Sequence, residues 1–231
     1  MLDTDFLFKE GYLVFDLESY DIELYNELKQ TFDLTTAKNS ISRIRMDGHS
    51  NNTDIVESIL KKHNLTDYVI NNNNIQLKSQ TSEYQNITKE LIPHYNEIFQ
   101  IWFYSDDLKP TGLSNISDKI NKKIVKELYN QTVTEYIIPE LTLYTEGCFI
   151  ENHNDGEQQQ RNCVILLYLN NDWKEDDGGE IILNGNLYIP PTFGKVVVLD
   201  FLHNNIEHAV NKVKNDFERY TLIRFINRQL N

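Results

Sequence analysis

Two histidines and one aspartate are the residues of this sequence that could together hold a metal ion. His153 and Asp155 are two positions apart in the stretch FIENHNDG, residues 149–156. Because side chains alternate along a strand, residues i and i+2 can point the same way at a strand end. His208 opens the later run HAVNKV and could add a ligand from another strand. Such a set would hold one face of a metal ion and leave the opposite positions open.

Two imidazoles and one carboxylate are the ligand set of non-haem iron(II) oxygenases. Open metal positions suit that chemistry, because O2 and a co-substrate must reach the metal directly. The pair His153–Asp155 is weak evidence on its own, since the Asn, Asp and Gly around it are also typical of an exposed turn. The hypothesis therefore depends on what else the chain brings to the same place.

An arginine further along the chain strengthens the hypothesis. Arg219 follows His208 across a predicted turn at KND, and Thr221 shares its face of the predicted strand. A buried arginine needs an anion, because an unpaired buried charge is costly. Its planar guanidinium suits a carboxylate in bidentate geometry. An anionic co-substrate reaching from the metal would meet this need, and a structural pair with Glu or Asp is the alternative.

The elements that must position these residues change character near residue 138. Beyond it, short apolar or alternating runs are separated by turn residues, which is typical of an all-β sandwich or barrel. The predicted strands are ELTLYTEG, NCVILLYLN, GEIILNG, KVVVLDFL, HAVNKV and RYTLIRFI.

The N-terminal half is predicted to be mostly helical. A strand is expected over residues 11–17, a loop at the NNNN of 71–74, and a kink or boundary at Pro93. The apolar spacing predicts helices over residues 22–32, 54–63, 84–103 and 117–137.

The predicted fold class is α+β, in one domain. The chain shows no internal repeat and no linker long enough to divide it. We therefore expect a single domain over residues 1–231, in which residues 1–137 form a helical support and residues 138–231 form a jelly-roll catalytic core.

Composition limits the function further. The chain has 231 residues, of which 40% are hydrophobic, and a net charge of -13. Nucleic-acid-binding proteins normally carry a basic stripe, which is missing here, so we expect no nucleic-acid partner. No apolar run approaches the roughly 18 residues of a membrane span, and the N-terminus lacks the basic start of a signal peptide. With only Cys148 and Cys163, expected to be buried thiols, a cytoplasmic protein is the simplest expectation.

From about residue 140 to 228 the sequence resembles the Fe(II)- and 2-oxoglutarate-dependent dioxygenases. It looks closest to the prolyl-4-hydroxylase branch, and within that branch to the hypoxia-factor prolyl hydroxylases. The motifs that carry the resemblance are YTEGCFIENHND, RNCVILLYLNNDW, DGGEIIL, HAV and RYTLIRF. The opening FKEGYLVFDL resembles the first strand of these enzymes, whereas residues 33–135 carry no resemblance. The resemblance implies a double-stranded β-helix, a jelly-roll and cupin-like core.

Residue by residue, the resemblance implies that His153, Asp155 and His208 hold Fe(II). His203 is a rival ligand, but the apolar positions after His208 and its distance to Arg219 fit the family better. The residues implied at 2-oxoglutarate are Arg219 and Tyr168 at its distal carboxylate, with Tyr144 and Thr221 as further contacts.

At the substrate, the resemblance implies Arg161 at the mouth of the site and Phe225 in its wall. Phe225 stands where the prolyl branch often has Trp, so the shape of the substrate pocket is expected to differ. Each of these residues also has a plain structural interpretation: Tyr168, for example, lies in an apolar run typical of a core strand.

The activity that the resemblance implies is hydroxylation of a C–H bond with Fe(II), 2-oxoglutarate and O2, with ascorbate as a candidate accessory reductant. The favoured substrate is a prolyl residue of a protein or peptide partner. A free amino acid or small metabolite is the alternative substrate. A cupin-like metal- or ligand-binding protein without turnover is a third hypothesis, against which Arg219 and Tyr168 argue, since a simple metal binder needs no carboxylate pocket.

Overall fold

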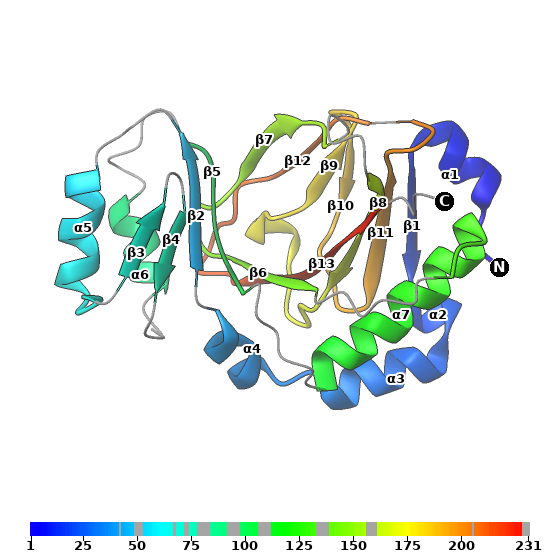
Figure 1. The fold of residues 1–231 in the computed structure, drawn as a ribbon, viewed down its shortest axis with the longest axis horizontal. Coiled ribbons are helices and arrows are strands. Elements are labelled where there is room, and N and C mark those ends of the chain that lie inside the picture. Colours follow the sequence, from blue (N-terminus) through cyan, green and yellow to red (C-terminus); the bar gives the residue numbers. More distant parts are fainter. Residues whose placement is uncertain are drawn as a thin grey trace.

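A computed structural model gives the fold as a β-barrel-like core flanked by helices at one end and by a smaller group of strands and helices at the other (Figure 1). The strands follow one another in the order β1-β11-β8-β13-β6-β5-β7-β12-β9-β10. The structure describes residues 1–41, 43–48, 53–66, 68–71, 74–77, 84–91, 98–105, 112–132, 139–155, 161–204 and 206–227.

The sheet is continuous through β5, and two antiparallel parts of it make up the core; we call these parts the larger and the smaller sheet. The larger sheet contains β1 (Tyr12–Asp16), β11 (Lys195–Asp200), β8 (Arg161–Tyr168), β13 (Arg219–Asn227) and β6 (Glu140–Tyr144). The smaller sheet contains β7 (Ile150–His153), β12 (His208–Val210), β9 (Ile181–Leu183) and β10 (Leu187–Ile189). This arrangement confirms the predicted α+β fold with a double-stranded β-helix.

Strand β8 shows why its run of apolar residues forms a strand covered on both faces. Ile165 and Leu167 pack in the large core that also holds the helices, whereas Leu166 and Tyr168 pack in a smaller core inside the barrel. The alternation follows from the two-residue period of a strand. A strand buried on both faces is therefore continuously apolar rather than alternating in polarity.

Helices cover the outer face of the larger sheet. They are α1 (Thr4–Glu10), α2 (Leu17–Tyr20), α3 (Ile22–Thr31) and α7 (Gly112–Tyr129). In α7 the four-residue spacing of Ile116, Ile120 and Ile124 places all three, fully buried, on one stripe. The side chain of Asp21 caps α3 by accepting hydrogen bonds from the backbone N–H groups of Glu23 and Leu24.

The smaller group of elements corrects two predictions. It contains α4 (Leu34–Ser40), β2 (Arg43–Gly48), α5 (Thr53–Lys62), β3 (Tyr68–Asn71), β4 (Asn74–Leu77), α6 (Tyr84–Leu91) and β5 (Ile98–Ser105). The predicted helix over residues 84–103 is wrong at residues 98–103, because IFQIWFYS (98–105) forms β5, and β-branched and aromatic residues favour a strand. Residues 92–97 of that prediction lie outside the described residues. The N-terminal half is therefore less helical than predicted. The predicted loop at 71–74 is shortened, since Asn71 ends β3 and Asn74 begins β4, and Pro93 lies outside the described residues.

Other predicted elements agree more closely with the structure. The predicted helices over 22–32 and 54–63 correspond to α3 and α5. The helix predicted over 117–137 is α7, which begins earlier, at Gly112, and ends earlier, at Tyr129. The strand expected to end near His153 is β7, with four residues, whereas the prediction missed β10, with three residues. Among the described residues, no helix is both long and apolar enough to cross a membrane.

Candidate active site

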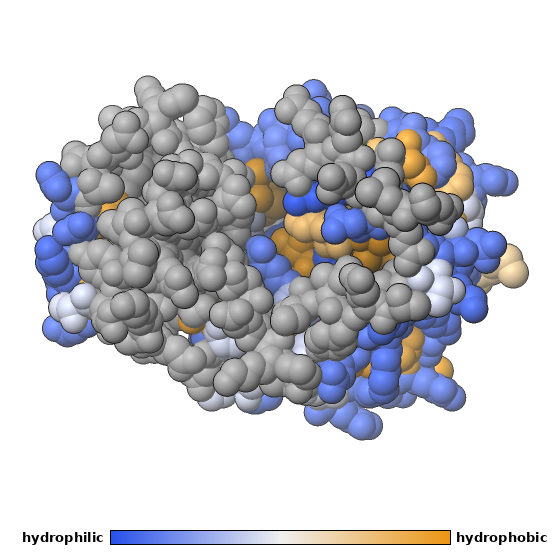
Figure 2. All heavy atoms as spheres, viewed as in Figure 1, coloured by the Kyte–Doolittle hydropathy of each residue, from blue (hydrophilic) through white to orange (hydrophobic). Residues whose placement is uncertain are grey.

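A cavity of about 210 Å³ lies between the two sheets of the barrel. Its lining comes from both sheets: from the larger one Glu140, Tyr144, Arg161, Val164, Leu166, Leu199, Arg219, Ile223 and Phe225, and from the smaller one with its flanking loop Ile150, His153, Asp155, Ile181, His208 and Val210. Figure 2 shows apolar side chains in a recess on the face of the molecule where the barrel lies. The cavity therefore combines apolar walls with a few polar groups, as ligand sites usually do.

His153, Asp155 and His208 meet at this cavity. Nε2 of His153 lies 3.9 Å from Oδ1 of Asp155, and Nε2 of His208 lies 3.7 Å from Oδ2 of the same carboxylate. The ligand atoms of all three lie within 4.8 Å of one another. His153 ends β7 and is paired across the sheet with His208 of β12, so strand pairing itself brings the two rings together.

The chemistry of this donor set fits a metal ion. Nδ1 of His153 lies 2.9 Å from the carbonyl oxygen of Glu151; when it donates its proton there, Nε2 is left free to bind a metal. Burial, and secondarily the charge of His153, lower the pKa of His208 to about 4, so that this imidazole is neutral at pH 7. Two imidazoles and one carboxylate would hold Fe(II) on one face, as the sequence predicted.

Arg219 lines the same cavity and is buried, with only 2% of its surface exposed. Its Nε donates a hydrogen bond to the carbonyl oxygen of Gly179 at 2.7 Å, and its Nη2 donates one to the hydroxyl of Tyr168 at 3.3 Å. No carboxylate among the described residues forms an ion pair with it, so the structural alternative to an anionic ligand is not supported there. A buried guanidinium without a carboxylate needs an anion from outside.

The other residues predicted at the co-substrate surround Arg219. The guanidinium carbon lies 4.9 Å from the centre of the Tyr144 ring and 5.0 Å from that of Tyr168. Burial raises the pKa of both phenols, so both keep their protons and can donate them in hydrogen bonds. Thr221 is fully buried on the same strand, and its hydroxyl has no partner among the described residues.

The two residues predicted at the substrate form the wall of the cavity on the larger sheet. The guanidinium carbon of Arg161 lies 3.7 Å above the centre of the Phe225 ring, close enough for a cation–π contact. Both residues line the cavity that the histidines also line. Their assignment to the substrate stays a prediction.

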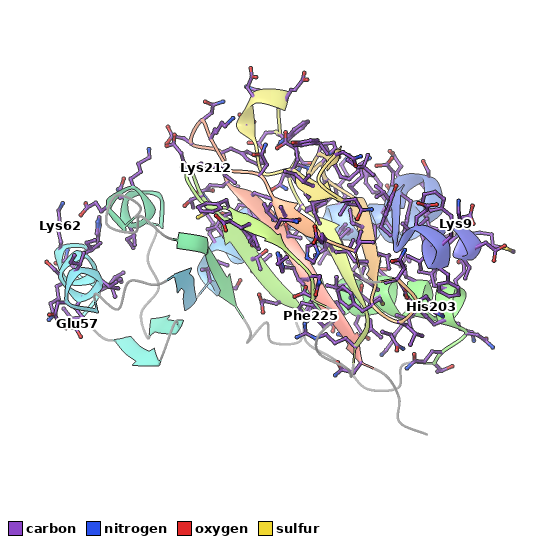
Figure 3. The ribbon with its side chains drawn as sticks, turned by 90° about the horizontal axis from the view of Figure 1, so that it is seen from above. Lys9, Glu57, Lys62, His203, Lys212 and Phe225 are labelled. Carbon is purple, nitrogen blue, oxygen red and sulfur yellow. The ribbon has the colours of Figure 1, made fainter. Side chains whose placement is uncertain are left out.

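The two other histidines that the structure describes, His63 and His203, are not part of this cluster. His203 is stacked on Phe8 at 3.8 Å and lies 3.2 Å from the Asp200 carboxylate, at the end of the molecule that carries α1 (Figure 3). Nε2 of His63 lies 3.1 Å from a Glu90 oxygen, and His49 and His94 lie outside the described residues. His208 rather than His203 is therefore the histidine that approaches His153 and Asp155.

Sequence reasoning missed two groups at the site. One is the carboxylate residue Glu140, which lines the cavity from the start of β6. The other is the carbonyl of Gly179, which holds Arg219. The paired glycines of DGGEIIL indicated that another part of the chain comes close to the backbone there. They did not indicate that Arg219 is the residue that does so.

Comparison with known proteins agrees with this geometry. Residues 139–227 match the model of the 2OG-Fe(II) oxygenase superfamily. The chain is similar to a prolyl hydroxylase from Trichoplax adhaerens, solved in complex with a hypoxia inducible factor oxygen degradation domain peptide fragment, with 14% identity, a TM-score of 0.53, and coverage of 96% of this chain and 86% of that one.

Two further solved structures are similar at lower TM-scores. One is a prolyl-4-hydroxylase from Pseudomonas putida, with 16% identity, a TM-score of 0.47, and coverage of 89% of this chain and 99% of that one. The other is a viral collagen prolyl hydroxylase from Paramecium Bursaria Chlorella virus-1 in complex with 2OG, with 12% identity, a TM-score of 0.45, and coverage of 95% and 96%. No curated protein sequence matches the chain.

The matched segment contains the three clustered candidate ligands and the buried arginine. Enzymes of this superfamily use Fe(II), 2-oxoglutarate and O2, and the same cavity is lined by the three candidate metal ligands and by a guanidinium. Residues 139–227 are thus a 2-oxoglutarate-dependent dioxygenase segment of the 2OG-Fe(II) oxygenase superfamily, in a chain whose fold is prolyl hydroxylase-like.

Proposed function

We propose that this dioxygenase hydroxylates a prolyl residue of a protein or peptide, and that residues 1–231 act as one catalytic domain. The observation that carries the proposal is the difference in exposure within the lining of the cavity. Arg219 is almost fully buried, whereas the side chains of His153 and Asp155 are 34% and 27% exposed. A residue that belongs to a larger chain can therefore reach the metal-binding face from solvent.

The size of the cavity supports a substrate that enters only in part. Small-molecule sites usually enclose roughly 300–1,000 Å³, and this cavity of about 210 Å³ is smaller even before 2-oxoglutarate enters it. Little enclosed space is left for a second whole molecule. One side chain, with the rest of its chain outside, meets that limit.

The walls near the metal-binding face suit a prolyl ring. Ile150, Ile181 and Val210 line the cavity on the same sheet as the two histidines. A prolyl ring is apolar and its nitrogen carries no proton to donate, so apolar walls cost it no hydrogen bond. The Trichoplax enzyme of similar fold was solved in complex with a peptide fragment, which is a precedent for a peptide substrate.

When Fe(II), 2-oxoglutarate and O2 are bound, the chemistry they supply is oxidation of a substrate C–H bond to C–OH, with 2-oxoglutarate converted to succinate and CO2. The chain's own contribution is to hold the co-substrate by Arg219, to align the reacting bond beside the metal, and to exclude water with its apolar walls.

The test is incubation of the iron-loaded protein with a proline-containing peptide library, 2-oxoglutarate and O2. Mass spectrometry should find peptides that gain one oxygen atom on proline, with succinate formed in proportion. The Asp155→Ala variant should form neither product. Oxygen gained only on other residue types would overturn the prolyl assignment, although not the dioxygenase.

One observation favours the alternative substrate class, a free amino acid. Glu140 and Arg161 line the same cavity and carry opposite charges, which suits the ammonium and carboxylate of a zwitterion. Feeding the enzyme free amino acids instead of peptides separates the two proposals: succinate formation stimulated by an amino acid and by no peptide would select the alternative.

A further inference from the structure

The guanidinium of Arg219 is aimed by a backbone carbonyl. Its Nε donates to the oxygen of Gly179 at 2.7 Å, the shorter of its two hydrogen bonds. The second, to the hydroxyl of Tyr168, is made by Nη2 at 3.3 Å. Because a guanidinium is planar and rigid, fixing Nε and one terminal nitrogen fixes the direction in which the other terminal nitrogen points.

The Gly179 carbonyl is itself held in place from both sides. The backbone oxygen of Asp177 accepts a hydrogen bond from the N–H of Lys214, and that of Glu180 accepts one from the N–H of Asn211. The indole Nε1 of Trp173 donates to the oxygen of Gly178 at 2.9 Å. The segment before β9 is thus fastened to the segment after β12, and the carbonyl of Gly179 cannot turn freely.

Residue 179 must also lack a side chain. Its φ of +77° favours glycine, and a Cβ there would lie 3.0 Å from Cδ of Arg219 and 3.3 Å from Cγ2 of Val213. The first contact is closer than ordinary van der Waals packing, so the arginine would have to move. A displacement of a few tenths of an ångström matters at a site whose groups must hold the productive geometry to about 0.5 Å.

We propose that Gly179 is a positioning residue for the co-substrate: its carbonyl orients Arg219, and its missing side chain leaves the arginine room to face the distal carboxylate of 2-oxoglutarate. This inference rests on the proposed role of Arg219 at that carboxylate. Trp173 supports the same arrangement one residue earlier, through Gly178.

The experiment compares two keto acids on two glycine variants. Gly179→Ala and Gly185→Ala both place alanine at a positive φ, +77° and +72°, but a Cβ at Gly185 meets nothing within 4 Å. Both variants therefore carry the same kind of backbone strain, and only one disturbs Arg219. The ligands are 2-oxoglutarate and 2-oxopentanoate, which has the same carbon chain without the distal carboxylate. Calorimetric titration of the Mn(II)-loaded proteins measures affinity without turnover, and thermal unfolding checks the fold.

Gly179→Ala should weaken the binding of 2-oxoglutarate about tenfold, because a well-aligned hydrogen bond between charged groups would be lost. The affinity for 2-oxopentanoate should change by less than about twofold, because that ligand cannot reach Arg219. Gly185→Ala should leave both affinities unchanged. Equal weakening of both keto acids in Gly179→Ala, or no change in either, overturns the positioning role.

Two further variants keep the result decisive. Arg219→Ala must abolish the preference for 2-oxoglutarate over 2-oxopentanoate; if the preference survives, the proposed role of Arg219 fails, and the inference fails with it for that separate reason. If Gly179→Ala does not fold, Trp173→Phe decides, since it removes the hydrogen bond to Gly178 without adding an atom. It should lower the preference about threefold, and an unchanged preference in that variant overturns the inference.

Discussion

Thr221 and Tyr168 are paired directly across strands β13 and β8, and both side chains are completely buried. Yet the Thr221 hydroxyl has no hydrogen-bond partner within the part of the chain that the structure describes. A buried hydroxyl without a hydrogen-bond partner costs stability. Because Thr221 shares a strand with Arg219, we expect a bound ligand to supply the missing hydrogen bond. The distal carboxylate of 2-oxoglutarate has the acceptor oxygens to do so.

Thr221→Val should therefore separate stability from binding. Valine keeps the shape but removes the unpaired hydroxyl, so the ligand-free protein should be as stable as the parent or more stable by about 1 kcal/mol. Affinity for 2-oxoglutarate should fall about fivefold, through loss of a hydrogen bond to a charged group. Urea unfolding and calorimetric titration measure the two effects.

The matched control is Thr142→Val on the facing strand. The Thr142 hydroxyl donates to the backbone oxygen of Thr221 at 3.2 Å, so its loss should lower stability and leave 2-oxoglutarate affinity unchanged. A Thr221→Val variant that is less stable than the parent and binds normally would contradict the assignment.

Metal binding should distinguish the two histidines that compete in the sequence. His208→Ala removes a ligand of the cluster with His153 and Asp155 and should abolish stoichiometric binding of Fe(II) or Mn(II). His203→Ala, which loses its contact with Asp200 instead, should bind the metal as the parent does. Equilibrium dialysis followed by metal analysis measures both variants, and metal loss in His203→Ala alone would reverse the assignment.

The Asp200 carboxylate should contribute to stability rather than to catalysis. It is fully buried and accepts hydrogen bonds from the Tyr129 hydroxyl at 2.8 Å and from the backbone N–H groups of His203 at 2.7 Å and Asn204 at 3.1 Å. Asp200→Ala leaves these donors unpaired and should cost about 3 kcal/mol in urea unfolding. Asp16→Ala, which breaks an exposed pair with Lys195, should cost less than about 1 kcal/mol. Similar losses in both variants would show that the buried network adds nothing.

The Cys163 thiol should be inert in the folded protein. Burial raises its pKa from 9.0 to about 12, so that at pH 8 only about one thiol in ten thousand is ionised. Iodoacetamide should modify Cys163 only after unfolding, as peptide mass mapping would show. Because the folded state holds this proton more tightly than the unfolded chain, the contribution of the thiol to stability is complete below pH 9 and is lost as the pH rises towards 12. Rapid labelling of the native protein at pH 8 would show that the thiol is accessible.

The sequence predicted the strands around the site better than the region outside the barrel. Between its two asparagines the run NCVILLYLN is continuously apolar because β8 is buried on both faces, and such a pattern is hard to mistake. The segment of residues 84–103 misled the prediction because its first part is an amphipathic helix, while Trp102 and Phe103 belong to a strand that pairs with β2. That pairing depends on a partner distant in sequence, which helical periodicity cannot reveal.

The site was predictable in its side chains but not in its backbone. Residue type and order in the sequence pointed to four side chains, and the structure brings all four to one cavity: His153, Asp155, His208 and Arg219. Nothing in the sequence distinguishes the Gly179 carbonyl, since every residue has a backbone carbonyl. Only the folded chain shows which carbonyl faces the arginine.

The direct register between His153 and His208 has a consequence for how the protein opens. An ion held by both residues would act as a cross-link between the short strands β7 and β12, which lie far apart along the chain. Local separation of these strands would then require the ion to leave first. The rate of amide hydrogen exchange along Ile150–His153 would consequently report how long the metal stays bound.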